Sequence, residues 1–131
     1  MRAIARSAVA PAESRLRWLM LGTTRTSSLC AGIFSTGQRY LAFSMAPSSD
    51  QMRPRDVLAV ALSAPGGAYF SKIMAIRRDT PPAAQVAEYP KGRGWAYPSV
   101  LEHEGQVYIA YSATKERCCL STLPLDALRV G

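Results

Sequence analysis

Residues 95–112 carry the pattern that most constrains the fold, because they read as two β-strands joined by a tight turn. Beyond the turn, every second residue is large and apolar or aromatic: Val107, Ile109 and Tyr111. Period-two alternation beside a glycine-containing turn predicts a β-hairpin. The turn at 102–105 also contains polar residues that need no role beyond turn formation: Glu102, His103 and Glu104. Tyr97 is expected where the first strand begins, after the basic, glycine-rich stretch 91–94.

The rest of the body shows the same pattern of short strands separated by turns. Apolar or alternating runs occupy residues 29–34, 39–45, 57–62, 70–76 and 118–123. The run at 57–62 is apolar without interruption, which predicts a strand buried on both faces. No helical pattern lies between the strands, so we expect antiparallel sheets in an all-β fold. The strands form a group of four over 29–76 and a group of three over 97–123, and pattern alone leaves propeller blades and a small β-sandwich open.

Positive charge is concentrated at the start of the chain. The 131 residues have a formal net charge of +7, and residues 1–28 contain five arginines and one glutamate, which is four of those seven charges. The body has no Lys/Arg run with interleaved aromatic residues, so we expect no nucleic-acid partner. No apolar stretch approaches the ~18–20 residues of a membrane span, so we expect none.

Residues 1–27 form a basic leader that we expect to lie outside the β fold. The leader is rich in arginine and nearly free of acidic residues, as transit peptides are. Its pattern allows a short helix. A start site assigned too far upstream would leave the same pattern, so both explanations stay open.

The cysteines do not form a metal-binding pattern. Cys30, Cys118 and Cys119 lack C-x-x-C spacing, and the chain has a single histidine. Adjacent residues of a strand point to opposite faces, so Cys118 and Cys119 are poor partners in one site. We expect the cysteines to act as small buried hydrophobic residues, and we expect no metal and no cofactor.

Five stretches stand in the order and spacing of a known protein family: residues 28–32, 55–63, 94–100, 108–116 and 123–128. They resemble the C-terminal blades of the sialidase (neuraminidase) superfamily, six-bladed β-propellers with BNR (Asp-box) repeats. The resemblance covers about residues 28–128. It implies that this region is the C-terminal portion of a propeller domain, with about two blades of four antiparallel strands.

The turn at residues 63–70 corresponds to the repeat hallmark of that family, Ser-x-Asp-x-Gly-x-Thr-Trp/Phe. Ser63, Gly67 and Phe70 match it, whereas Pro65 replaces the aspartate and Tyr69 the threonine. The aspartate accepts backbone hydrogen bonds in the turn, which a proline side chain cannot do. The box is therefore degenerate, at a place that serves stability rather than catalysis.

The resemblance implies a glycoside hydrolase of the exo-sialidase type, acting on an anionic, sialic-acid-like sugar. Sialidases use a tyrosine nucleophile. A neutral phenol suits a reacting carbon that carries a carboxylate, because an Asp or Glu nucleophile would be repelled. In the family a glutamate activates the tyrosine, an aspartate is the acid/base, and three arginines bind the substrate carboxylate through their planar forks.

By position, Tyr97 matches the nucleophile of that family, and Arg55 matches its third arginine. Without the resemblance, Tyr97 would be a packed residue at a strand end, and Arg55 a surface ion-pair partner of Asp56. Arg53 competes with Arg55 from two residues away. Two further basic residues could hold an anionic ligand or simply be solvated: Lys91 and Arg93.

Most of the catalytic set that the resemblance implies has no match in this chain. The other two arginines, the aspartate and the glutamate belong to earlier blades, and residues 1–27 contain no aspartate, one glutamate and no strand pattern. A propeller closes with roughly four to eight blades. We therefore expect a C-terminal fragment of a sialidase-like hydrolase, inactive alone. The alternative is a non-catalytic β domain that binds carbohydrate or a protein partner.

Overall fold

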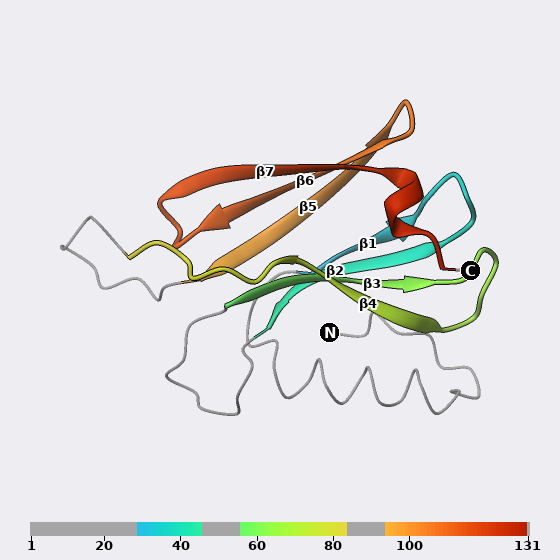
Figure 1. The fold of residues 1–131 in the computed structure, drawn as a ribbon, viewed down its shortest axis with the longest axis horizontal. Helices are drawn as coiled ribbons and strands as arrows, with labels where there is room; N and C mark the ends of the chain where they lie inside the picture. Colours follow the sequence, from blue (N-terminus) through green and yellow to red (C-terminus); the bar gives the residue numbers. More distant parts are fainter. Residues whose placement is uncertain (1–28, 46–55, 84–93, 131) are drawn as a thin grey trace.

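The structure is a computed structural model that describes residues 29–45, 56–83 and 94–130. These residues form two antiparallel β-sheets (Figure 1). The first is a four-stranded meander of β1 (Cys30–Ile33), β2 (Arg39–Met45), β3 (Val57–Ser63) and β4 (Phe70–Arg77). The second is a three-stranded meander of β5 (Trp95–His103), β6 (Gln106–Ala113) and β7 (Arg117–Pro124), followed by the short 3-10 helix η1 (Leu125–Leu128). The predicted all-β class, antiparallel pairing and grouping into four and three strands are confirmed.

The hairpin turn between β5 and β6 is tighter than the sequence suggests. β5 continues to His103, which pairs with Gln106, so the turn consists of Glu104 and Gly105 alone. Both take positive φ, 48° and 74°. This is the backbone of the two-residue turns that match the twist of paired strands.

The main core lies between the two sheets. Alternate residues of β3 and β6 meet there, and the side chains of η1 join them: Leu58, Val60, Leu62, Val107, Ile109, Tyr111, Leu125 and Leu128. Burying one large apolar side chain stabilises a fold by about 1.5–3 kcal/mol. Apolar burial at this interface is therefore the main contribution that holds the two sheets together.

The opposite face of the first sheet is also buried. Leu41 and Phe43 of β2 form a second cluster with Ala59 and Ala61 of β3, and all four are at most 2% exposed. Successive residues of β3 thus belong alternately to the first cluster and to the second. The prediction of a strand buried on both faces is confirmed.

The turn between β3 and β4 is held by two of the residues that match the Asp-box hallmark. The Ser63 hydroxyl accepts a hydrogen bond from the backbone N–H of Arg39 (2.8 Å) and donates one to the carbonyl of Ala64 (2.9 Å). The backbone N–H of Gly67 donates to the same carbonyl (2.8 Å). A Cβ on Gly67 would lie 2.9 Å from that oxygen, so the turn requires glycine there.

The sheets are closest along β5, which packs chiefly against β2 and β1. They diverge toward β4 and β7, which lie on opposite outer sides of the molecule (Figure 1). The first strands, β1 and β5, therefore lie where the two sheets are close together, and the last strands, β4 and β7, lie where the sheets are farther apart.

Candidate functional site

Tyr97 lies in a β-bulge near the start of β5. Two residues of β5, Tyr97 and Pro98, face one residue of β6, Tyr111, because the pairing passes from Ala96–Ser112 to Ser99–Ala110. An extra residue on one strand defines a bulge, and bulges often re-aim a side chain next to a functional site. Tyr97 is the third residue of β5, so the strand begins two residues earlier than predicted.

The backbone of Tyr97 is strained. Its φ is 55°, in the left-handed region that costs a residue with a Cβ about 1–2 kcal/mol. Pro98 adds to the strain, because the residue before a proline is pushed toward extended conformations. Tyr97 is 48% exposed, and its side chain makes no hydrogen bond within the described part of the chain. The bulge therefore presents a phenol to solvent.

The other predicted site residue is not placed. Arg55 lies outside the described residues, as do its competitor Arg53 and the two basic residues of the approach, Lys91 and Arg93. The geometry of the candidate site accordingly rests on Tyr97 and on the residues that hold its strand.

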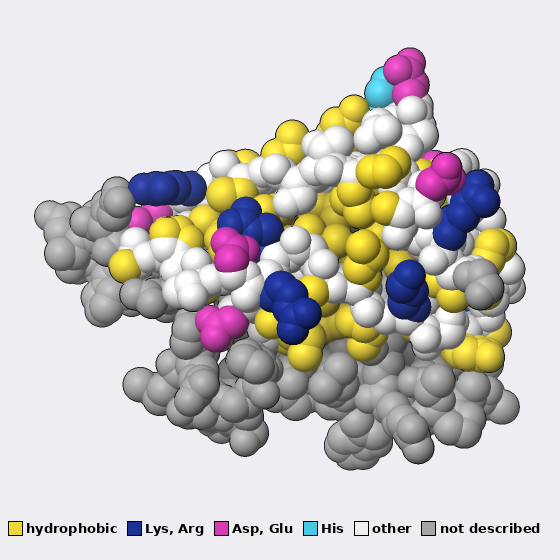
Figure 2. Space-filling model, in the orientation of Figure 1, with side chains coloured by type: hydrophobic (Ala, Val, Ile, Leu, Met, Phe, Trp, Pro, Cys, Tyr) yellow, Lys and Arg dark blue, Asp and Glu magenta, His cyan; other side chains and the backbone are white. Residues whose placement is uncertain are grey.

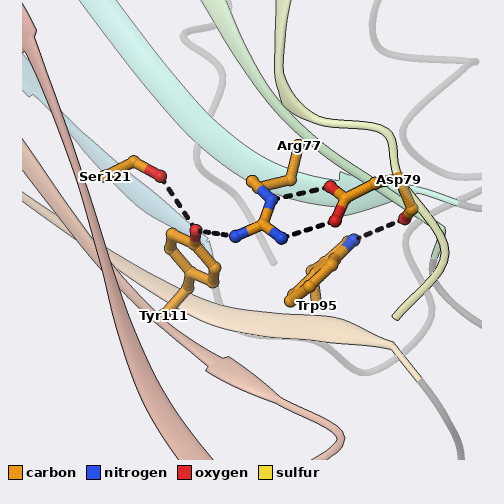
Figure 3. Close-up of polar contacts among 5 residues, drawn as sticks. All are labelled: Arg77, Asp79, Trp95, Tyr111 and Ser121. Atoms are coloured by element: carbon orange, nitrogen blue, oxygen red, sulfur yellow. Dashed lines mark hydrogen bonds and ion pairs between the residues drawn. The ribbon is translucent and has the colours of Figure 1, made fainter. Parts of the chain in front are cut away.

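A polar cluster joins the two sheets beside the bulge (Figure 3). Arg77, at the end of β4, makes a bidentate ion pair with Asp79, with Nε–Oδ1 and Nη2–Oδ2 distances of 2.7 and 2.5 Å. Its Nη1 donates to the hydroxyl of Tyr111 on β6 (2.9 Å). That hydroxyl is also 2.8 Å from Oγ of Ser121 on β7. One guanidinium thus links the edge of the first sheet to β6, and the Tyr111 hydroxyl extends this link to β7.

Trp95 packs into the same cluster. The Arg77 guanidinium carbon lies 4.2 Å from the centre of the indole, a cation–π contact. The indole N–H donates to the backbone carbonyl of Asp79 (3.3 Å). Tyr111 meets the indole edge to face, with ring centres 5.8 Å apart. Trp95 is 2% exposed, so β5 is anchored two residues before Tyr97.

The charges of the cluster compensate each other. The hydrogen bonds with Arg77 hold the pKa of Asp79 below its usual range, and the same bonds with Asp79 raise the pKa of Arg77 further above its own. The side chains are 32% and 55% exposed for Arg77 and Asp79, so solvent screens much of this interaction. The Arg77–Asp79 pair is neutral overall, and its guanidinium is already hydrogen-bonded, so we assign the cluster a structural role. We call it the clasp between the sheets; its residues are Arg77, Asp79, Trp95, Tyr111 and Ser121.

A second junction connects β5 to the turn between β1 and β2. The carboxylate of Glu102 accepts hydrogen bonds from the backbone N–H (2.8 Å) and the hydroxyl of Ser35. The expectation that Glu102 has no role beyond a turn is therefore wrong, because it lies in β5 and its partner is distant in the sequence.

The pKa of Tyr40 is raised above its usual value. Burial is the largest cause, and the nearby Cys30 and Glu102 add to it.

The described residues show no metal cluster and no helix of membrane-spanning length. No three His, Cys, Asp or Glu side chains lie close enough together there to hold a metal ion. No helix in the same ranges is both long and apolar enough to cross a bilayer. On the face shown in Figure 2, Lys and Arg side chains are spread among acidic and apolar ones rather than gathered in a patch.

The three cysteines are free thiols. Cys30 and Cys119 are half-buried, whereas Cys118 is exposed. Cys118 pairs with Ser112, one row away from the inward-facing pair Tyr111–Cys119, so it lies on the outer face of the second sheet. The expectation of a buried role is therefore wrong for Cys118.

The sequence pattern did not reveal the clasp, although it contains a partial signal. Tyr111 belongs to the inward row of β6, and Arg77 and Asp79 follow a predicted strand at a spacing that suits an ion pair. Their contact with Trp95 depends on how the two sheets meet.

Comparisons with protein-family models, with curated proteins and with solved structures find no match for this chain.

Proposed function

We propose that residues 28–128 are two blades of a sialidase-like β-propeller, and that Tyr97 is the nucleophile of a glycoside hydrolase of the exo-sialidase type. The observation that carries the proposal is the conformation of Tyr97, an exposed phenol held at a φ of 55° by a bulge. Strained backbone of this kind concentrates at functional sites, where the surrounding structure must enforce it.

The arrangement of the sheets supports the blade assignment. Each sheet is a meander, β5 packs against β1 and β2, and the sheets diverge toward their last strands (Figure 1). Blades arranged around a common axis have this relation, with first strands inside and last strands outside. Ser63 and Gly67 give further support, because both hold the turn between β3 and β4 at positions that match the Asp box.

The proposed chemistry begins with attack of the Tyr97 phenol oxygen on the anomeric carbon of the sugar. A bond forms between these atoms while the bond to the leaving oxygen breaks. The phenol proton passes to a general base, and a general acid protonates the leaving oxygen. Water then hydrolyses the glycosyl-enzyme bond. Arg55 is proposed to bind the sugar carboxylate, for which a bidentate guanidinium is well suited.

The chain carries two of the groups that this reaction requires, so we expect residues 1–131 to bind an anionic sugar without hydrolysing it. A fluorogenic sialoside should give no turnover with the purified chain, and measurable turnover would contradict this. Titration with sialic acid, followed by NMR, should shift the signals of Tyr97 and its neighbours in the bulge.

Arg55→Ala should abolish these shifts, and the control variant Arg78→Ala, at an exposed arginine of the described part of the chain, should retain them. N-acetylglucosamine, which lacks the carboxylate, is the ligand control. Absence of any shift at Tyr97 with sialic acid at millimolar concentrations would overturn the proposal.

The exposed ring of Tyr97 also favours a second candidate, a non-catalytic domain that stacks a sugar on an aromatic side chain. In that case N-acetylglucosamine and sialic acid should shift the same signals, and Arg55→Ala should bind both as the native chain does. The same titration thus separates the two functions.

A further inference from the structure

Trp95 and Val100 both face the core, although they lie five residues apart on β5. In an uninterrupted strand, residues an odd number of positions apart point to opposite faces. The extra residue in the bulge at Tyr97 and Pro98 reverses the alternation between them. The bulge is therefore what turns Trp95 inward.

The pairing of β5 with β6 allows a second register for the same segment. If the register of Ser99 with Ala110 continued without a bulge, Tyr97 would pair with Ser112. Ala96 would then face the core and Trp95 the outer face. Tyr97 would take the ordinary extended backbone of a strand. The two arrangements differ by a one-residue slip, which moves the side chains of Trp95 and Ala96 to opposite faces.

Backbone hydrogen bonds do not choose between the two arrangements. In the observed register the N–H of Thr114 donates to the carbonyl of Gly94 (2.7 Å), and after a slip it would donate to the carbonyl of Trp95, its new partner. The choice lies with the side chains. The observed register strains Tyr97, whereas the slipped one would take the indole away from Arg77 and Asp79 and leave an alanine in its place.

The surroundings of Trp95 strongly favour the observed register. The indole is 2% exposed, lies 4.2 Å under the Arg77 guanidinium, and donates to the carbonyl of Asp79. Burial of an indole with these contacts outweighs one left-handed residue. We propose that Trp95 is a positioning residue that fixes the register of β5 and thereby holds Tyr97 in the bulge with a strained backbone. Arg77 and Asp79 act through Trp95. The inference concerns the conformation of β5 and stands whether or not Tyr97 is a nucleophile.

The test exchanges two neighbouring residues. In the double variant Trp95→Ala/Ala96→Trp, composition is unchanged, but the slipped register now places the indole in the core. We expect NMR to show position 97 opposite Ser112 in place of position 96, and the carbon shifts of Tyr97 to move to extended values. Trp95→Phe is the matched control, since it keeps a large apolar side chain inside and should retain the native contacts.

Two results would overturn the proposal. One is a double variant that keeps position 96 opposite Ser112 and retains the left-handed carbon shifts of Tyr97. The other is a slipped register in Trp95→Phe. Should the double variant fail to fold, Trp95→Ala is measured in the same way. Loss of the left-handed shifts of Tyr97 as the major state supports the proposal, and their retention as the major state contradicts it.

Discussion

Gln38 allows a sharp test of how the described elements are held together. Its side chain is 1% exposed. Its Nε2 donates to the carbonyls of Ser63 (3.2 Å) and Leu128 (2.9 Å), and its Oε1 accepts from the hydroxyl of Thr36 (3.0 Å). One amide therefore connects the turn between β1 and β2, the end of β3, and the helix η1.

We expect Gln38→Leu to destabilise the protein by roughly 2–4 kcal/mol. Leucine is similar in size but has no donor, so the buried carbonyls of Ser63 and Leu128 lose their Nε2 partner. Leaving one buried acceptor without a partner costs about 1–3 kcal/mol. Some of the loss is offset because leucine gains apolar contacts.

Urea unfolding followed by tryptophan fluorescence measures this loss. With a slope typical of small proteins, the midpoint should fall by roughly 1–2 M. Lys72→Met is the control, because the Lys72 ammonium makes one long, exposed hydrogen bond to the carbonyl of Arg129 (3.4 Å), and its loss should change stability by less than about 0.5 kcal/mol. A Gln38→Leu protein within that margin of the native chain would refute the reasoning.

Three further predictions concern strain and titration. Lys115 is exposed at a φ of 60°, so Lys115→Gly should raise the free energy of unfolding by about 0.5–1 kcal/mol, and Lys115→Ala, which keeps the Cβ, should give no gain in thermal unfolding. Arg77 lowers the pKa of Asp79, so the stability from this pair is present above the unfolded pKa near 4 and is lost as pH falls through the folded value. Asp79→Asn should therefore flatten the stability profile in acid, and an unchanged profile from chemical unfolding would argue against the pairing. Burial raises the pKa of Tyr40, so its contribution is present below pH 10 and is lost as pH rises through the folded pKa; Tyr40→Phe should weaken the alkaline loss of stability, measured by urea unfolding at successive pH values.

The strands could be predicted because their side chains alternate. Val107, Ile109 and Tyr111 mark an inward row in the sequence, and the unbroken apolar run of β3 marks a strand between two clusters. The division into two sheets follows as well, since each sheet pairs only neighbours in the sequence.

The bulge and the clasp could not be predicted in the same way. Pro98 is a partial signal, because prolines within sheets favour edges and bulges. The inward direction of Trp95, however, becomes evident only when the second sheet packs on the first. The bonds of Glu102 to Ser35 and of Arg77 to Tyr111 join residues 67 and 34 positions apart, which no local pattern reports. The role of Arg55 stays a prediction.

The meander topology has a consequence for how the protein can be assembled. Every strand ladder in the described residues lies either within β1–β4 or within β5–β7, and no strand crosses between them. A break in the chain between Arg77 and Trp95 would therefore sever no ladder. Two pieces produced separately should recognise each other through the apolar faces, the Arg77 guanidinium and the Gln38 amide. We expect such halves to reconstitute the fold when mixed, as a split protein does.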